Sequence, residues 1–116
     1  MIINKTRKTK LAQREVFLKN PFSQGAGLMF KARDSVSNQA WVFVFRKDRR
    51  LSITMWFVFF PIDLIFLDEN KQVVELKEGL RPLALYRSRK KTSYLIELAA
   101  GSIKKSKTGL NDILCF

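Results

Sequence analysis

Hydrophobic residues occur along the chain in short runs, and several of these runs alternate with polar positions. Short runs rich in β-branched and aromatic residues are typical of β-strands. We therefore predict a mainly β fold of the α+β class: a small antiparallel, partly closed barrel-like domain with one or two short helices. The segments expected to form strands are residues 1–7, 14–19, 40–45, 51–60, 62–68, 72–79, 94–101 and 112–116.

Two apolar runs near the middle of the chain predict a β-hairpin. Residues Ala40–Phe45 and Leu51–Phe60 both have the composition of strands, and the charged segment Arg46–Arg50 between them is typical of a turn. Pro61 is expected to end the second strand, because proline cannot donate a hydrogen bond to a sheet. Residues 80–93 show no clear period, which predicts an irregular, basic connection.

Short helices are indicated at two places. Asn20 is a good N-cap residue and Pro21 suits the first helical position, so one or two helical turns are expected before Gly25. Ser102 is expected to cap a second short helix within residues 102–107.

The composition excludes several classes of chemistry. The 116 residues suit one domain, and a hydrophobic fraction of 47% provides for a real core. Histidine is absent, which rules out His-dependent triads and His-metal sites. Cys115 is the one cysteine, so no intrachain disulfide or thiolate zinc cluster can form, and we interpret it as an apolar residue of a terminal strand. We expect no metal and no cofactor.

The formal net charge of +12 suits association with a polyanion, such as nucleic acid or anionic lipid headgroups. The alternative is that each basic run is a solvated turn, and only convergence of the runs on one face would favour binding. Lysines and arginines also gather near the amino terminus and in residues 104–107. The candidate polyanion-binding residues are Arg46, Lys47, Arg49, Arg50, Arg87, Arg89, Lys90 and Lys91.

The sequence shows no segment of the kind that directs a protein to or through a membrane. No apolar run of signal-peptide length precedes the charges of the amino terminus. The run Ile53–Leu67 is shorter than the roughly 20 residues that a membrane-spanning helix needs. We therefore expect a cytoplasmic protein without a transmembrane segment.

Two carboxylates interrupt apolar strands and are candidates for chemistry. Asp63 shares a face of its predicted strand with Ile65 and Leu67, and both faces of that strand look buried. A buried carboxylate needs a partner, so Asp63 either accepts backbone hydrogen bonds or serves a pocket. Glu97 interrupts residues 94–101 in the same way, and the two groups could form an acid–base pair. The candidate pocket residues are Met29, Trp56, Asp63, Tyr86 and Glu97.

Four motifs, in this order, resemble domain-of-unknown-function family 192. They are GLMF (27–30), Met55 with FPIDLIFLD (60–68), YLIELAAG (94–101) and GLNDIL (109–114). The resemblance implies a compact, mostly β fold with short helices and no established reaction. The chain departs from the family pattern after Met55, where Trp-Phe-Val replaces a polar Lys-Asn-Thr. Asn111 stands where the family usually has glycine, and asparagine tolerates a left-handed turn.

These observations favour an uncharacterised small domain that acts as a non-catalytic binding or accessory module. The first alternative is polyanion (nucleic-acid) binding through the basic loops. The second is a small-ligand pocket or enzyme site around Asp63. A protein-interaction module that uses an exposed apolar strand edge is a further possibility. An enzyme is the less favoured class, because the usual catalytic groups are missing.

Overall fold

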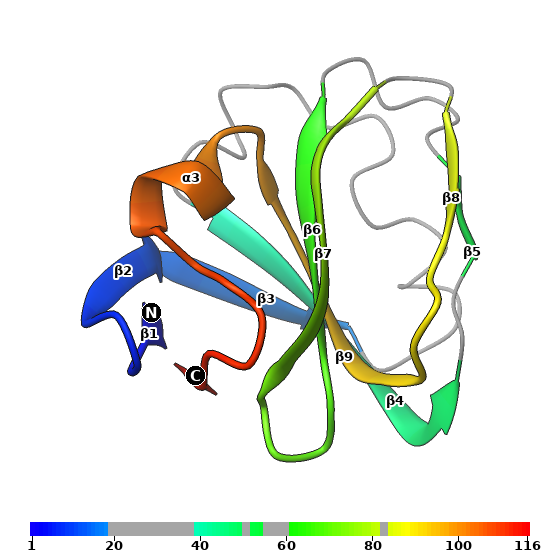
Figure 1. The fold of residues 1–116 in the computed structure, drawn as a ribbon, viewed down its shortest axis with the longest axis horizontal. Helices are drawn as coiled ribbons and strands as arrows, with labels where there is room; N and C mark the ends of the chain where they lie inside the picture. The colour runs from blue at the N-terminus through cyan, green and yellow to red at the C-terminus, as the bar shows by residue number, and fades with distance from the viewer. Residues whose placement is uncertain (19–38, 50–51, 55–60, 82–83) are drawn as a thin grey trace.

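The computed structural model describes residues 1–18, 39–49, 52–54, 61–81 and 84–116, and within them the chain is mainly β (Figure 1). One short helix, α3, spans Ser102–Ser106. The described strands are β1 (Ile2–Asn4), β2 (Thr9–Ala12), β3 (Arg14–Leu18), β4 (Gln39–Arg49), β5 (Ser52–Thr54), β6 (Ile62–Leu67), β7 (Val73–Leu80), β8 (Leu85–Arg87), β9 (Thr92–Ala99) and β10 (Leu114–Cys115). This confirms the predicted β-rich α+β class.

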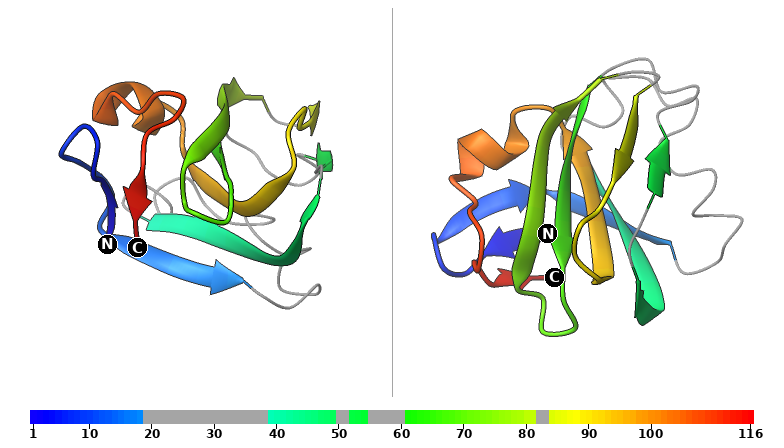
Figure 2. Two further views of the ribbon diagram at one scale, coloured as in Figure 1. Left: turned by 60° about the horizontal axis from the view of Figure 1, so that its bottom comes forward. Right: turned by 45° about the vertical axis from the view of Figure 1, so that its right-hand side comes forward.

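The strands form three hydrogen-bonded groups. The largest sheet has the order β3-β4-β9-β6-β7, and β10-β1-β2 and β5-β8 form smaller sheets. All pairs are antiparallel except β3 with β4, which run parallel. A parallel pair needs a connection of a dozen or more residues, and residues 19–38 provide that length. The two views in Figure 2 show the large sheet curving without closing into a barrel.

Strand β6 is buried on both faces, as the sequence predicts. All six of its residues are buried. Ile62, Leu64 and Phe66 belong to one apolar cluster, which also includes residues of β4 and β9. Ile65 and Leu67 belong to a second cluster, on the other face of the sheet. We call these the first and second faces.

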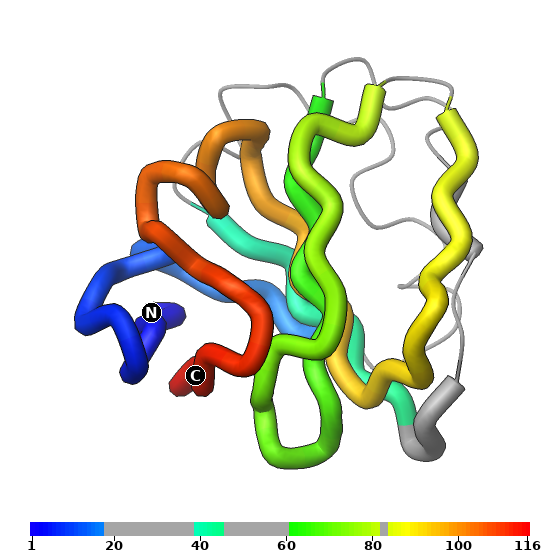
Figure 3. Tube along the Cα trace, viewed as in Figure 1, coloured from blue at the N-terminus to red at the C-terminus, as the bar shows by residue number. Residues whose placement is uncertain are grey.

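Different elements cover the two faces. The second face packs against Ile2 of β1, Ile103 of α3 and Leu114 of β10, so both chain ends contribute to the core there. The tube in Figure 3 shows the two termini side by side, next to α3. On the first face, Ala84 and Tyr86 pack against the sheet from the side of β8.

The predicted hairpin of residues 40–60 is wrong in its pairing. Strand β5 pairs with β8, with Ile53 opposite Tyr86. The physical reason is that β4 is hydrogen-bonded to β3 on one edge and to β9 on the other, which leaves no free edge for β5. Strand β8 lies within residues 80–93, so the prediction of an irregular connection there is also wrong. Strand β4 continues to Arg49, through most of the predicted turn.

The helix start also differs from the prediction. Gly101 occupies the N-cap position of α3 with a φ of 95°, and no side chain caps the helix. The Ser102 hydroxyl instead donates a hydrogen bond to the carbonyl of Ala99, at 2.6 Å. The helix expected near Asn20 lies outside the described residues. In the part of the chain that is described, no helix has the length and apolar character needed to cross a bilayer.

Candidate functional site

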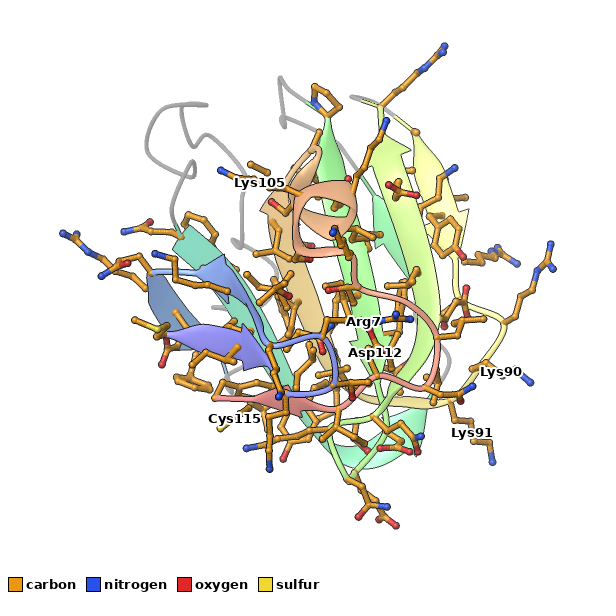
Figure 4. The ribbon with its side chains drawn as sticks, turned by 60° about the vertical axis from the view of Figure 1, so that its left-hand side comes forward. Arg7, Lys90, Lys91, Lys105, Asp112 and Cys115 are labelled. Atoms are coloured by element: carbon orange, nitrogen blue, oxygen red, sulfur yellow. The ribbon has the colours of Figure 1, made fainter. Side chains whose placement is uncertain are left out.

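The basic segment 87–91 exposes its cations to solvent and buries its one small polar residue. Arg87, Arg89, Lys90 and Lys91 are exposed, whereas Ser88 is buried with 6% of its surface accessible. The segment connects β8 to β9, and Figure 4 shows Lys90 and Lys91 pointing away from the sheet. All four predicted cations of this segment are therefore available for binding.

Glu75 of β7 fixes the backbone of this segment through hydrogen bonds. Its Oε1 accepts hydrogen bonds from the backbone N–H groups of Arg89 (2.7 Å) and Lys90 (3.0 Å). The hydroxyls of Ser88 and Thr92 donate to the Lys90 carbonyl at 3.2 and 3.3 Å. A loop with its backbone fixed in this way loses less conformational entropy when its side chains bind a partner.

Tyr86 belongs to the same support. Its hydroxyl donates to Oε2 of Glu75, and its ring lies 5.7 Å from the ring of Phe66 on the first face. Burial and the hydrogen bond to Glu75 raise the pKa of Tyr86 to about 12. The ring is therefore packed against the core and is not an exposed stacking platform.

Strand register brings the second predicted basic segment next to the first. Arg49 of β4 lies opposite Thr92 of β9, after a register shift beyond Val44. Ser52 of β5 lies opposite Arg87 of β8. Arg49 therefore lies beside the start of β9 and Ser52 beside Arg87, while Arg50 lies outside the described residues. We define the loop surface by the exposed cations Arg87, Arg89, Lys90 and Lys91 together with the neighbouring basic segment 46–49.

Asp63 is completely buried and bonded to backbone. Its Oδ1 accepts the N–H of Gly79 at 2.9 Å, and its Oδ2 accepts the N–H groups of Gly101 (3.1 Å) and Ile103 (2.9 Å). These bonds tie β6 to the end of β7 and to the start of α3. They are the contacts that the structural interpretation of Asp63 expects.

Glu97 lies on the other face of the sheet from Asp63. It sits opposite Leu64 of β6 and Trp41 of β4, which are both in the apolar cluster of the first face. Only 7% of its surface is accessible, and no hydrogen bond joins it to another described residue. Burial alone raises the pKa of Glu97 to about 8.

The candidate pocket residues that the structure describes therefore do not lie on one face of the sheet. Asp63 faces the side of Leu98, and Glu97 faces the side of Leu64, so the sheet separates the two carboxylates and they cannot act as an acid–base pair. Tyr86 lies on the same face as Glu97. Met29 and Trp56, the other two candidates, lie outside the described residues. In the described part of the chain no group of three or more acidic or cysteine side chains could hold a metal ion.

Sequence analysis missed a buried polar network that joins the two chain ends. Oδ2 of Asp112 accepts hydrogen bonds from Asn4 Nδ2 (2.9 Å), Arg7 Nε (3.2 Å) and the Gly109 N–H (2.8 Å). Asn4 Nδ2 also donates to the Thr108 hydroxyl at 3.0 Å. Burial acts to raise the pKa of Asp112, but these hydrogen bonds and the Arg7 charge outweigh it and hold that pKa below its usual value.

One signal for this network was present in the sequence. Asn111, directly before Asp112, has a φ of 72°, which is the left-handed turn that the residue type allows. That turn aims the Asp112 carboxylate back at the Gly109 N–H. The partners Asn4 and Arg7 lie more than a hundred residues away, and no local pattern points to them.

Comparison with known proteins gives a consistent result. Residues 2–115 match the DUF192 family, described as "Uncharacterized ACR". A UPF0127 protein of Thermococcus sibiricus is 34% identical over 97% of this chain and 71% of its own length. A UPF0127 protein of Pyrococcus abyssi is 29% identical over 97% of this chain and 93% of its own length.

Two solved structures share the fold. One, from Sinorhizobium meliloti, is described as a "putative transcription regulator"; it has a TM-score of 0.80 and 24% identity, covering 87% of this chain and 79% of that one. The other, from Novosphingobium aromaticivorans, is described as a protein of unknown function; it has a TM-score of 0.80 and 16% identity, covering 88% of this chain and 74% of that one.

Proposed function

Because the chain belongs to the DUF192 family, which has no assigned activity, we propose a function from the loop surface itself: a non-catalytic module that binds the phosphate backbone of nucleic acid. Lysine and arginine contacts to phosphate give affinity that does not depend on base sequence. A cytoplasmic location and a single-domain organisation are parts of the same proposal. Cell fractionation would test the location.

The observation that carries this proposal is the register of β4 with β9 and of β5 with β8. In support, Arg49 of the first basic segment is paired with Thr92, which directly follows the second segment, and Arg87 is paired with Ser52. Convergence on one face is what separates a binding surface from isolated solvated turns.

Glu75, which contacts segment 87–91, does not neutralise the cations of that segment. Glu75 points inward and is occupied by two backbone N–H groups and the Tyr86 hydroxyl. Within the described residues, no salt bridge involves Arg87, Arg89, Lys90 or Lys91. These four cations are therefore free to contact an anionic partner.

The loop surface favours backbone contact over base stacking. Proteins that bind single strands without sequence preference use exposed aromatic rings as platforms. Tyr86, the aromatic residue of this region, is packed on Phe66 and bonded to Glu75. We therefore expect similar affinity for duplexes of different sequence and no marked preference for single strands.

Removing three cations from the loop surface tests the proposal. We expect the variant Arg87→Gln, Arg89→Gln, Lys91→Gln to bind a labelled duplex at least about tenfold more weakly at low salt, and its salt dependence to fall by about one unit of slope per cation. Fluorescence anisotropy would measure both quantities. The matched control, Arg14→Gln, Lys77→Gln, Arg81→Gln, also removes three positive charges but lies outside the loop surface.

Two results would contradict the proposal. One is an equal loss of affinity in the control variant, which would mean that net charge alone causes binding. The other is binding to vesicles of anionic phospholipid without binding to duplexes, which would assign the loop surface to membranes.

A small-ligand site is a second candidate, and Glu97 favours it. Its carboxyl group is nearly buried on an apolar face, without a hydrogen bond to another described residue. Buried carboxyl groups with a raised pKa are frequent at ligand sites. Asp63, in contrast, has its oxygens occupied by backbone. A ligand that hydrogen-bonds Glu97 should raise the melting temperature of the wild type but not that of Glu97→Leu.

A further inference from the structure

A second basic surface lies at the other side of the molecule. It combines the β1–β2 turn with α3 and the residue that follows it. Thr9 of β2 donates to the carbonyl of Ser106 in α3 at 2.7 Å, which joins the two elements. Its cations are all exposed. We call this the helix surface and define it by Lys5, Arg7, Lys8, Lys104, Lys105 and Lys107.

Buried hydrogen bonds fix the geometry of the helix surface. The Asn4 side chain donates to Asp112 and Thr108, and its Oδ1 accepts the backbone N–H of Arg7 at 3.0 Å. The Ser106 and Thr108 hydroxyls share a further hydrogen bond of 2.7 Å. These hydrogen bonds thus connect the backbone segments that carry cations far apart in the sequence.

Two lysines of this surface have left-handed backbone. Lys8 has a φ of 58° and Lys107 a φ of 59°, in the left-handed region that glycine or asparagine adopts more readily. Among the described residues, the salt bridge from Arg7 to Asp112 is the only one on this surface.

The two basic surfaces face different directions. In Figure 1, α3 and the β1–β2 turn lie on the left, β8 lies on the right, and β6 and β7 stand between them. The molecule measures 34 × 30 × 21 Å. Duplex DNA has a persistence length of about 150 base pairs, so a short duplex is too stiff to wrap from one surface to the other.

We propose that the helix surface is a second nucleic-acid site, so that one molecule bridges two duplex segments. This rests on the proposed function of the loop surface, which would hold the first segment. The phosphate backbone is the ligand at both sites, since cations without base-reading side chains contact phosphate.

A bead assay tests the bridging directly. One duplex of about 20 base pairs is fixed to beads, and a second, fluorescent duplex is added with the protein at about 50 mM salt, where phosphate contacts are strong. We expect the wild type to recruit the fluorescent duplex. The variant Lys8→Gln, Lys104→Gln, Lys105→Gln should still bind a single duplex in solution but recruit at least about fivefold less of the second.

The controls separate this inference from the proposed function. The loop-surface variant described above removes the same number of charges and should also lose recruitment, while it keeps only the single-duplex binding that the helix surface provides. If the wild type binds one duplex and recruits no second, bridging is wrong and the proposed function stands. Unchanged recruitment by the helix-surface variant, as bridging through a protein dimer would give, also overturns the inference.

Discussion

Replacing Asp63 with asparagine is expected to lower the free energy of unfolding by about 3–5 kcal/mol. Asp63 is completely buried and accepts three backbone hydrogen bonds, two of them at Oδ2. An asparagine can direct only one oxygen at these groups, and its NH₂ would face an N–H donor. At least one buried backbone N–H then loses its acceptor, which is costly in the interior.

Urea unfolding at pH 7 measures this effect, and Asp68→Asn is the matched control. Oδ1 of Asp68 also accepts two backbone N–H groups, from Asn70 at 2.8 Å and Gln72 at 3.0 Å, in the β6–β7 turn, but both bonds go to one oxygen, which the carbonyl oxygen of an asparagine can replace. We expect the control to lose about 1 kcal/mol. An Asp63→Asn variant as stable as this control would refute the structural role of Asp63.

Replacing Glu97 with glutamine is expected to stabilise the protein by an amount that grows with pH. Burial raises the pKa of Glu97 from 4.5 to about 8. Between these values the folded state binds more protons than the unfolded state, so stability falls as the pH rises. A shift of about 3.5 units, at about 1.36 kcal/mol per unit, sets an upper limit of about 5 kcal/mol. The uncharged amide avoids this loss.

The difference between the unfolding free energies of Glu97→Gln and the wild type isolates this group. It should be small near pH 4.5 and reach several kcal/mol in favour of the variant near pH 8. Glu69→Gln, at an exposed turn, serves as the control for removing one acidic side chain. A flat difference for Glu97→Gln would mean that its carboxyl group is hydrated or paired in the folded protein.

The strands could be predicted from the sequence because their signals are local. The continuous apolar run of β6 correctly indicates burial on both faces. The alternation of side chains along each strand also correctly predicts which residues share a face of the sheet with Asp63 and with Glu97. Strand pairing is not local. The error in the hairpin arose because β3, which is distant in sequence, occupies the edge of β4 that a hairpin would need.

In the candidate site, too, the local features could be predicted from the sequence and the non-local contacts could not. The exposure of the four cations in residues 87–91 follows from composition, but the proximity of this segment to Arg49 depends on the register of β4 against β9. The partners of Asp63 are amides from the end of β7 and from the start of α3, and no periodic pattern marks a backbone donor. The family resemblance, now confirmed over residues 2–115, supplied the fold but no activity.

The most direct test of the central claim, that the loop surface binds the phosphate backbone, is a titration of the wild-type protein against a labelled duplex at about 50 and about 200 mM salt. Six or more phosphate contacts predict a loss of affinity on the order of a thousandfold between the two conditions, for duplexes of any sequence. Absence of binding at the lower salt, or an affinity that salt does not change, would contradict the claim.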